Sequence, residues 1–321
     1  MTADVKEATP HPEDVLAKLL RVAGLPDPTS TRRISERGLD HEAHVVLLAD
    51  GRQAVLRQWR RPREPEQSRS WIVEAHGLPA PRLLAEMRGA SLYEFAPGDL
   101  LGDLIETGQC VDRTWHLVGQ AYRCVHSVRF PAGLVGGVQP HQIVLRPLDP
   151  AAQMHTWIGD SVTGLRRHAP EALRYLPSLH DLVDQAAPSL RGAVTALGHG
   201  DINMWNILVD EDRVWLIDWD EPRVGDPAME VALLDKHASL FNGCGLDQAF
   251  FEGYGQPPAE PNTSLHRVVQ TLRWVASSDW DSCERQTLSA ELHARTHQWL
   301  RTLLVYVARL PAHLQRLRSL V

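Results

Sequence analysis

The stretch HGDINMWNILVDEDRVWLID, residues 199–218, limits the possible folds of this chain more than any other part of its sequence. Two short apolar runs, 207–209 and 214–217, lie on either side of a polar turn. Both runs are rich in the β-branched and aromatic residues that suit strands. We therefore expect a β-hairpin in which Val209 pairs with Val214.

This register would gather polar side chains at the open end of the hairpin. Cross-strand neighbours have Cβ atoms roughly 5 Å apart, so Asn206 should lie opposite Ile217 and beside Asp218, with Asp201 in the preceding loop. Carboxylate and amide oxygens are hard ligands that suit magnesium and leave positions for water and phosphate oxygens. The sequence thus predicts a Mg²⁺ site formed by Asn206 and Asp218.

Length and composition define the setting of such a site. A chain of 321 residues with 43% hydrophobic residues can form one large domain or two lobes. Its four cysteines form no CxxC pair, which argues against a zinc cage or a disulfide framework. The polar N-terminus lacks the apolar segment of a signal peptide, and no run approaches the length of a membrane span. We expect a soluble cytoplasmic protein without a membrane partner.

Charge is distributed unevenly along the chain. The whole formal net charge of −7 falls in residues 97–321, and an acidic surface is a poor partner for nucleic acid. We favour a solvated acidic face as the explanation. The alternative is a pocket in this region that attracts a cationic substrate.

Residues 1–96 combine strand and helix patterns. The predicted elements are a helix over 13–22, strands over 44–48 and 53–59 joined by an Asp-Gly turn, a helix over 64–76, and strands over 82–86 and 91–95. Downstream of Pro97, apolar residues recur at helical spacing over 111–128 and 288–317. We therefore expect an α+β fold with two lobes. Residues 1–96 would form a small antiparallel β lobe, and residues 97–321 a large, mainly helical lobe with a small-molecule site in the cleft.

Several motifs resemble the aminoglycoside phosphotransferase family of small-molecule kinases. These motifs are HGD at 199–201, Asn206 five residues after Asp201, IDWD at 217–220 and GDP at 225–227. The segments LRQWR, LPAPRLL, SLYEFAPGD and AYRCVHSV resemble further parts of the family pattern, over roughly residues 35–255. The resemblance implies a protein-kinase-like fold, ATP or GTP as phosphoryl donor and Mg²⁺ as cofactor.

The resemblance also suggests a role for each residue of the acidic hairpin. Phosphoryl transfer to a hydroxyl needs a positioned acceptor and compensated negative charge. Asp201 is the expected catalytic base, and Asn206 and Asp218 are the expected magnesium ligands. We expect His199 to bond backbone near the loop, and Asp226 to fix the loop that follows.

The nucleotide site is predicted mainly in residues 1–96. Arg57 stands where the family commonly has a strand lysine, and a guanidinium can grip phosphate in a fork. A surface arginine on an edge strand is the alternative interpretation. Its carboxylate partner would be Glu66 or Glu74. The other predicted nucleotide-binding residues are Gly38 in a covering hairpin and Tyr93, Glu94, Phe95 and Ala96 along the adenine edge.

The acceptor is the least defined part of the prediction. IDWDEP and FFEGYG resemble spectinomycin-type aminocyclitol kinases, whereas GLD and VLR resemble macrolide kinases. We expect phosphorylation of an aminoglycoside or aminocyclitol antibiotic. The alternatives are a macrolide, an endogenous amino sugar or other hydroxy metabolite, and a non-catalytic nucleotide-binding module. The candidate substrate contacts are Trp205, Asp279, Asp281 and Glu284, although the three carboxylates could also form a solvated cluster.

Overall fold

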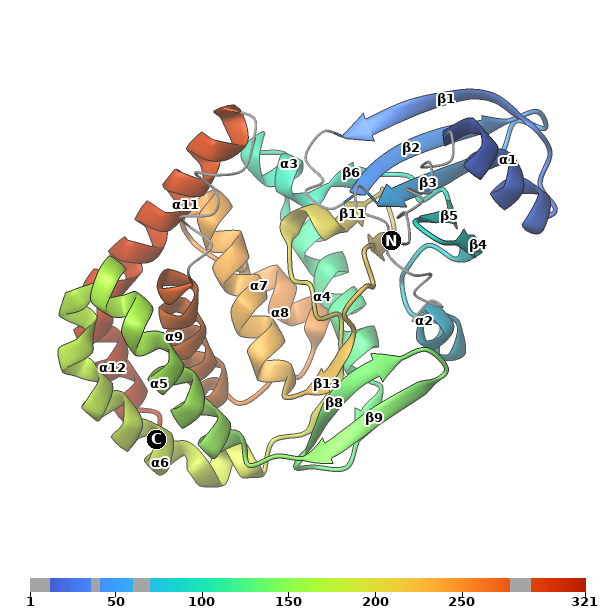
Figure 1. Ribbon diagram of the computed structural model, residues 1–321. Helices are drawn as coiled ribbons and strands as arrows, with labels where there is room; N and C mark the ends of the chain where they lie inside the picture. Colours follow the sequence, from blue (N-terminus) through green and yellow to red (C-terminus); the bar gives the residue numbers. More distant parts are fainter. Residues whose placement is uncertain (1–11, 36–40, 60–69, 278–289) are drawn as a thin grey trace, which may run out of the picture. The chain divides into compact units, whose positions relative to one another are not determined.

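The chain forms two compact units, each with its own sheet and core. The structure, a computed structural model, describes residues 12–35, 41–59, 70–277 and 290–321. The contacts divide the chain into Met1–Pro97 and Gly98–Val321. Figure 1 labels the helices and strands of both units.

The first unit is built on one five-stranded antiparallel sheet with the strand order β1-β2-β3-β5-β4. Its described elements are α1 (Pro12–Val22), β1 (Pro28–Ser35), β2 (His41–Leu48), β3 (Gln53–Trp59), α2 (Ser70–His76), β4 (Leu83–Met87) and β5 (Ala90–Glu94). These elements confirm the predicted helix over 13–22 and the four predicted strands. The predicted helix over 64–76 is described only from Ser70, and its first residues lie outside the described part.

Local chemistry explains the β2–β3 hairpin. Asp50 accepts a hydrogen bond from the backbone of Arg52 at 3.1 Å, and Gly51 has a φ of 84°, which residues with a Cβ rarely adopt.

The flanking strand β1 was not predicted. Its sequence PTSTRRIS has no apolar alternation, because it lies at the sheet edge with its described side chains exposed.

The core of the first unit joins α1 to the sheet. The helix buries one apolar face, formed by Val15, Leu16, Leu19 and Leu20. The sheet contributes Val46, Leu48, Ala54, Leu56, Ala85, Ala90 and Leu92. The apolar face of the helix repeats every three to four residues, which is the spacing of a helix that packs on one side.

The second unit is mainly helical. Its described helices are α3 (Leu101–Glu106), α4 (Asp112–His126), α5 (Pro150–His168), α6 (Leu176–Arg191), α7 (Pro227–Asn242), α8 (Gln248–Tyr254), α9 (Glu260–Ala276), α11 (Ala290–Ala308) and α12 (Leu310–Arg318), with the 3-10 turns η1 (Pro170–Tyr175) and η2 (Met204–Asn206). The predicted helix over 111–128 is confirmed as α4. The described part of the predicted stretch over 288–317, from Ala290 onward, is two helices, because Pro311 starts a new helix rather than continuing the old one.

This unit also contains two small sheets. Their strands are β6 (Asp99–Leu100), β7 (Arg129–Phe130), β8 (Leu134–Gln139), β9 (Gln142–Pro147), β10 (Thr195–Gly198), β11 (Ile207–Val209), β12 (Val214–Leu216) and β13 (Arg223–Gly225). The strand orders are β7-β10-β13-β8-β9 and β12-β11-β6. The larger sheet was not predicted, because its strands are only 2 to 6 residues long and come from distant parts of the chain. The predicted α+β class is confirmed.

Helices α5, α6, α9, α11 and α12 share the main core of the second unit. Buried residues in this core include Met154, Ile158, Leu165, Leu179, Leu182, Leu265, Val269, Leu303 and Leu314. Figure 1 shows α5, α6, α9 and α12 side by side around this core. None of the helices in the described residues is both long and apolar enough to cross a membrane.

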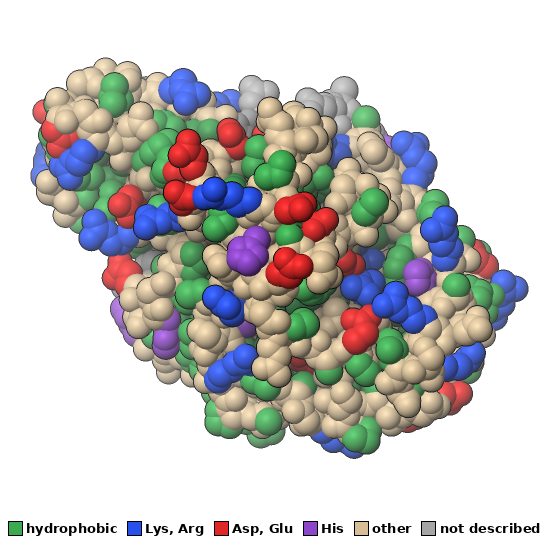
Figure 2. Space-filling view, turned by 180° about the vertical axis from the view of Figure 1, so that it is seen from behind, with side chains coloured by type: hydrophobic (Ala, Val, Ile, Leu, Met, Phe, Trp, Pro, Cys, Tyr) green, Lys and Arg blue, Asp and Glu red, His purple; other side chains and the backbone are tan. Residues whose placement is uncertain are grey.

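Acidic and basic side chains are interspersed on the face of the molecule shown in Figure 2. Surface ion pairs of the second unit include Arg191–Asp149 and Arg316–Glu260. A mixed pattern of this kind is typical of a solvated surface.

Helix α5 offers a matched test of helix packing. A Cβ on Gly164 would lie 1.8 Å from the carbonyl oxygen of Ala276 in α9, whereas a Cβ on Gly159 would meet nothing within 4 Å. In a helix interior, alanine is more favourable than glycine by about 1 kcal/mol. We therefore expect Gly159→Ala to raise the thermal unfolding midpoint and Gly164→Ala to lower it. Equal stabilisation by both substitutions would contradict the close α5–α9 contact.

Candidate active site

The acidic hairpin has the register predicted from the sequence. Strands β11 and β12 pair Ile207 with Leu216, Leu208 with Trp215, and Val209 with Val214. The N–H of Ile217 donates to the carbonyl oxygen of Asn206 at 2.9 Å, which extends the pairing to the open end. The backbone therefore brings Asn206 and Asp218 to neighbouring positions, although they are twelve residues apart in the chain.

Asp201 and Asn206 are in direct contact. The Nδ2 amide of Asn206 donates to Oδ2 of Asp201 at 2.8 Å. Because a carboxylate can only accept, the amide oxygen of Asn206 faces away from this bond. The turn η2 positions Asn206, and the side chain of Asn203 caps this turn by accepting from the N–H of Trp205 at 3.0 Å. Asp201 is exposed and Asn206 partly exposed, so both can meet a ligand.

Asp218 leaves the hairpin with an unusual backbone conformation. Its φ is 69°, in the left-handed region where aspartate is tolerated better than most residues. The following Trp219 closes a tight turn, since its indole N–H donates to the carbonyl oxygen of Leu216 at 2.8 Å. Asp218 itself is partly exposed.

The donor set at this end of the hairpin fits magnesium. It offers the amide oxygen of Asn206 and the carboxylate of Asp218, both hard oxygen ligands, and Mg²⁺ is commonly held by one or two such groups together with phosphates and water. In the described part of the chain, no group of three or more His, Cys, Asp or Glu side chains is arranged to hold a metal. A site of this composition would therefore need phosphate or water oxygens to complete it.

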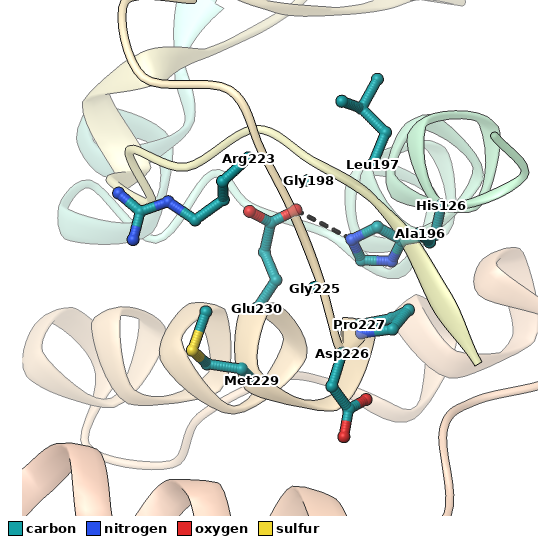
Figure 3. Close-up of a pocket in the computed structure, with 10 residues that line it drawn as sticks. All are labelled: His126, Ala196, Leu197, Gly198, Arg223, Gly225, Asp226, Pro227, Met229 and Glu230. Atoms are coloured by element: carbon teal, nitrogen blue, oxygen red, sulfur yellow. Dashed lines mark hydrogen bonds and ion pairs between the residues drawn. The ribbon is translucent and has the colours of Figure 1, made fainter. Parts of the chain in front are cut away.

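Buried Glu230 anchors the loop that carries Asp201. Its Oε2 accepts the N–H of His199 at 3.0 Å and its Oε1 accepts the N–H of Gly200 at 2.9 Å. The Nε2–H of His126 donates to Oε2 at 2.8 Å, and Nδ1 of His126 lies 2.8 Å from the hydroxyl of Tyr254. Figure 3 shows Glu230 rising from α7 toward His126 in a pocket that Arg223, Asp226 and Met229 also line.

Gly200 and His199, the two residues whose N–H groups Glu230 accepts, have further constraints. Gly200 has a φ of 88°, and a Cβ there would lie 1.8 Å from the carbonyl oxygen of Glu221. His199 is 1% exposed, and its Nε2–H donates to the carbonyl oxygen of Ile217 at 2.9 Å. The prediction that His199 bonds backbone near the loop is confirmed.

Asp226 has the structural position expected of it. Its side chain caps the start of α7 by accepting the N–H of Ala228 at 2.8 Å. Its other oxygen lies 3.4 Å from Nε2 of His266. Asp226 thus has a structural role, as predicted, but the segment that it fixes is the start of helix α7 and not a loop.

The electrostatics of the anchor favour a charged carboxylate. Burial alone would raise the pKa of Glu230, but the hydrogen bond and charge of His126 and the N–H of Gly200 outweigh this effect and lower it. Burial raises the pKa of Tyr254, and the nearby Glu230 and Asp226 carboxylates add to this rise. The tyrosine therefore stays neutral while Glu230 stays ionised.

Arg57 lies in the central part of the first unit's sheet. Strand β3 pairs with β2 on one side and β5 on the other, so the alternative of a surface arginine on an edge strand is wrong. The Arg57 side chain is 7% exposed, its Nη2 lies 3.2 Å from Nδ1 of His41, and its guanidinium lies 4.3 Å from the ring centre of Trp59.

The other predicted nucleotide residues fall at the end of β5. Tyr93 and Glu94 close this strand, and Phe95 and Ala96 follow it. Of the two proposed partners of Arg57, Glu74 is an exposed residue of α2. Glu66 and Gly38 lie outside the described residues.

Trp205 belongs to an aromatic cluster of the second unit. Its ring lies 5.2 Å from Phe241 and 5.5 Å from Trp299, and the guanidinium of Arg295 lies 4.8 Å above it. Its role as a pocket wall stays a prediction. The predicted contacts Asp279, Asp281 and Glu284 lie outside the described residues.

No role was predicted for the anchor residues Glu230, His126 and Tyr254. His126 and Tyr254 were noted only within the segments AYRCVHSV and FFEGYG. Glu230 was not singled out. The sequence signal that could have found it is a lone acidic residue inside the apolar run PAMEVALL. An acidic residue in such a run is expected to be buried, and a charge is rarely buried without a partner.

One family model matches most of the chain. Residues 33–266 match the model of a family described as Phosphotransferase enzyme family, APH. Curated protein sequences give no significant match.

Solved structures show the same fold. A thermostable mutant of aminoglycoside phosphotransferase APH(4)-Ia, in a ternary complex with AMP-PNP and hygromycin B, is 20% identical over 91% of this chain and 98% of that chain, with a TM-score of 0.60. A choline/ethanolamine kinase family protein from Mesorhizobium loti is 14% identical over 95% and 98%, with a TM-score of 0.63. Choline kinase LicA from Streptococcus pneumoniae is 13% identical over 92% and 100%, with a TM-score of 0.57. The expected kinase-like fold is confirmed.

The anchor can be tested through stability. A hydrogen bond to a charged group is worth about 1.5–3 kcal/mol, so we expect Glu230→Gln, which weakens three such bonds, to lower the free energy of unfolding by at least that order. Because the pKa of Glu230 is lowered in the folded protein, its stabilisation is complete above the ordinary glutamate value of about 4.3 and is lost as pH falls through the lowered value.

Denaturant unfolding at several pH values would measure this effect. The difference between wild type and Glu230→Gln should be constant near neutral pH and shrink in acid. The control is Glu221→Gln, since the side chain of Glu221 is 69% exposed and forms an ion pair of 3.1 Å with Arg223. A loss of stability in the control equal to that of Glu230→Gln would refute the anchor.

Proposed function

The chain belongs to the phosphotransferase enzyme family, and from this premise we propose that it transfers the terminal phosphoryl group of a nucleoside triphosphate to a hydroxyl of a small molecule. The observation that carries the proposal is the contact between Asp201 and Asn206 at the open end of the hairpin, next to Asp218. In this proposal Asp201 binds the acceptor hydroxyl. Asn206 and Asp218 bind the metal that accompanies the nucleotide.

We assign Asp201 as the catalytic base. Its Oδ2 is held by the amide of Asn206, so its Oδ1 is left to accept a hydrogen bond from the acceptor hydroxyl. Holding that hydroxyl in line with the phosphoryl group is the main work required of the protein in this reaction. The carboxylate also provides a place for the proton that leaves the hydroxyl.

Asn206 and Asp218 would hold Mg²⁺ through the amide oxygen and the carboxylate. When bound, the ion offsets the negative charge of the nucleotide phosphates. The side chain of Asn206 suits this task, because its amide N–H fixes Asp201 while its amide oxygen stays available to the metal.

Arg57 would serve the phosphates of the nucleotide. It is the buried cation of the central strand β3, and a guanidinium remains charged at any physiological pH. The backbone of Tyr93, Glu94, Phe95 and Ala96 would hold the base. Either ATP or GTP is compatible with backbone recognition of this kind.

For the acceptor we propose a cationic molecule that carries a hydroxyl, with an aminoglycoside or aminocyclitol antibiotic as first choice. The support is the fold shared with a phosphotransferase solved with hygromycin B and the net negative charge of residues 97–321. A choline-like or other endogenous hydroxy amine is the second candidate, because two similar folds are choline kinase-like proteins. A resistance role in the cytoplasm follows from the first choice.

The base assignment predicts a specific defect in Asp201→Asn. Loss of a general base typically costs a factor of about 100 or more, so acceptor-dependent release of nucleoside diphosphate should fall by at least that factor. The affinity for Mg-nucleotide should stay within a few fold. The assay would use a panel of hygromycin B, other aminoglycosides, spectinomycin, choline and ethanolamine.

Asp210→Asn is the matched control, since Asp210 is an exposed carboxylate in the turn of the same hairpin. It should keep wild-type turnover. Full turnover in Asp201→Asn would remove Asp201 from the reaction.

The nucleotide assignment predicts weaker binding in Arg57→Ala. A hydrogen bond to a charged group is worth about 1.5–3 kcal/mol, which corresponds to roughly a 10- to 150-fold loss of nucleotide affinity by calorimetry. Arg57→Lys keeps the charge and should recover part of the loss, which separates phosphate binding from packing on Trp59. Arg52→Ala, on the exposed β2–β3 turn, should bind as wild type. Unchanged affinity in Arg57→Ala would contradict the assignment.

A further inference from the structure

Two histidines meet on neighbouring helices of the second unit, away from the residues assigned above. His155 belongs to α5 and His180 to α6. Their Nδ1 atoms lie 2.6 Å apart, and their ring centroids lie 4.9 Å apart with planes 16° from parallel, so the two rings meet edge to edge through these atoms. On the other side of His155, Nε2 lies 2.9 Å from Oδ1 of Asp184, one turn after His180.

The hydrogen bonds fix the protonation of His155. A carboxylate can only accept, so Nε2 of His155 carries its proton and donates to Asp184. In the neutral ring the free electron pair is then on Nδ1, and it faces His180. This is the carboxylate–histidine arrangement that orients metal-binding histidines in proteins.

His180 can present the same atom. In the hydrogen-bonded pair its Nδ1 carries the proton, because the Nδ1 of His155 must accept. If the proton of His180 is on Nε2 instead, both Nδ1 electron pairs converge on one point. Burial lowers the pKa of His180, and the neighbouring His155 lowers it further, so the neutral ring is favoured near pH 7.

The helices beneath the pair are held in fixed register. Arg191 at the end of α6 forms an ion pair of 2.8 Å with Asp149, which also caps the start of α5. Below the histidines, Met154 and Ile158 of α5 share a buried core with residues of α6, among them Leu179 and Val183. The backbone of the pair is thus preorganised, while the His155 side chain remains 32% exposed.

We propose that His155 and His180 form a binding site for a divalent transition-metal ion such as Zn²⁺, with the two Nδ1 atoms as ligands and Asp184 orienting His155. Imidazole nitrogen favours Zn²⁺, Ni²⁺ and Cu²⁺ over Mg²⁺ and Ca²⁺. The site has two protein ligands, and water or a soluble anion completes the coordination. It is separate from the oxygen ligands proposed for Mg²⁺.

The geometry fits such an ion after the two rings move. Zinc–nitrogen bonds are about 2.0–2.1 Å, so two nitrogens at a tetrahedral angle lie about 3.3 Å apart. The two rings need to separate by roughly 0.7 Å from their hydrogen-bonded distance and to turn from facing each other head-on toward the tetrahedral angle. Because both side chains are partly exposed, this movement does not require the buried core to change.

A bound ion would fasten α5 to α6. Any ligand that binds only the folded state stabilises it by mass action. Zn²⁺ should therefore raise the thermal unfolding midpoint of the chain.

Calorimetric titration of the full chain with Zn²⁺ tests the proposal. Excess Mg²⁺ would be present throughout, so that the hard-ligand site contributes no heat. Wild type should bind one Zn²⁺ that His155→Ala and His180→Ala each bind at least 10-fold more weakly. Asp184→Asn should weaken the same event by about 10- to 100-fold, the range typical of losing a residue that orients a ligand.

Two controls separate metal binding from packing. His76→Ala removes an exposed histidine in the first unit and should leave the Zn²⁺ titration unchanged. His180→Gln can still donate a hydrogen bond to His155, so it should keep the stability of the metal-free protein and yet lose the Zn²⁺ event.

Cu²⁺ provides a spectroscopic readout that a structural role would not change. Electron paramagnetic resonance of the Cu²⁺ complex should show two coordinated imidazole nitrogens in wild type and one in either single variant. The proposal is overturned if wild type binds no Zn²⁺, or if the His155→Ala/His180→Ala double variant binds it as tightly as wild type.

Discussion

The candidate active site depends on one buried carboxylate. The loop before Asp201 must turn inward from β10, and this leaves the N–H groups of His199 and Gly200 without strand partners. Buried N–H groups without an acceptor are costly, and Glu230 supplies both acceptors at 3.0 and 2.9 Å. His126 donates a further hydrogen bond to Glu230 at 2.8 Å. Glu230 therefore fixes the backbone of the loop where it leaves β10.

The anchor reaches the hairpin through a single residue, Ile217. His199 donates to the carbonyl oxygen of Ile217, and the N–H of Ile217 donates to the carbonyl oxygen of Asn206. The side chain of Asn206 then bonds Asp201 at 2.8 Å. The loop and the hairpin thus form a closed ring of hydrogen bonds. A displacement of Glu230 would therefore reach Asp201 and Asn206.

The sequence predicted the parts of this site that depend on local pattern. Two apolar runs around a polar turn determine the register of β11 and β12, and that register alone brings Asn206 to Ile217. Such reasoning did not predict Glu230, because its partners His126, His199 and Gly200 precede it by 104, 31 and 30 residues. The same limit applies to the sheet of β7, β10, β13, β8 and β9, whose short strands pair across long stretches of chain.

The two sets of proposed metal ligands differ in a way that prevents competition between ions. Transition metals bind nitrogen and mixed sites more tightly than Mg²⁺ does, so a histidine within the hairpin's ligand set would favour the wrong ion. His199 is close to that set, but its Nε2 is committed to the carbonyl oxygen of Ile217 and the ring is 1% exposed. The partly exposed imidazole pair lies instead on α5 and α6. Oxygen ligands at the hairpin and nitrogen ligands on the helices would therefore select different ions from the same solution.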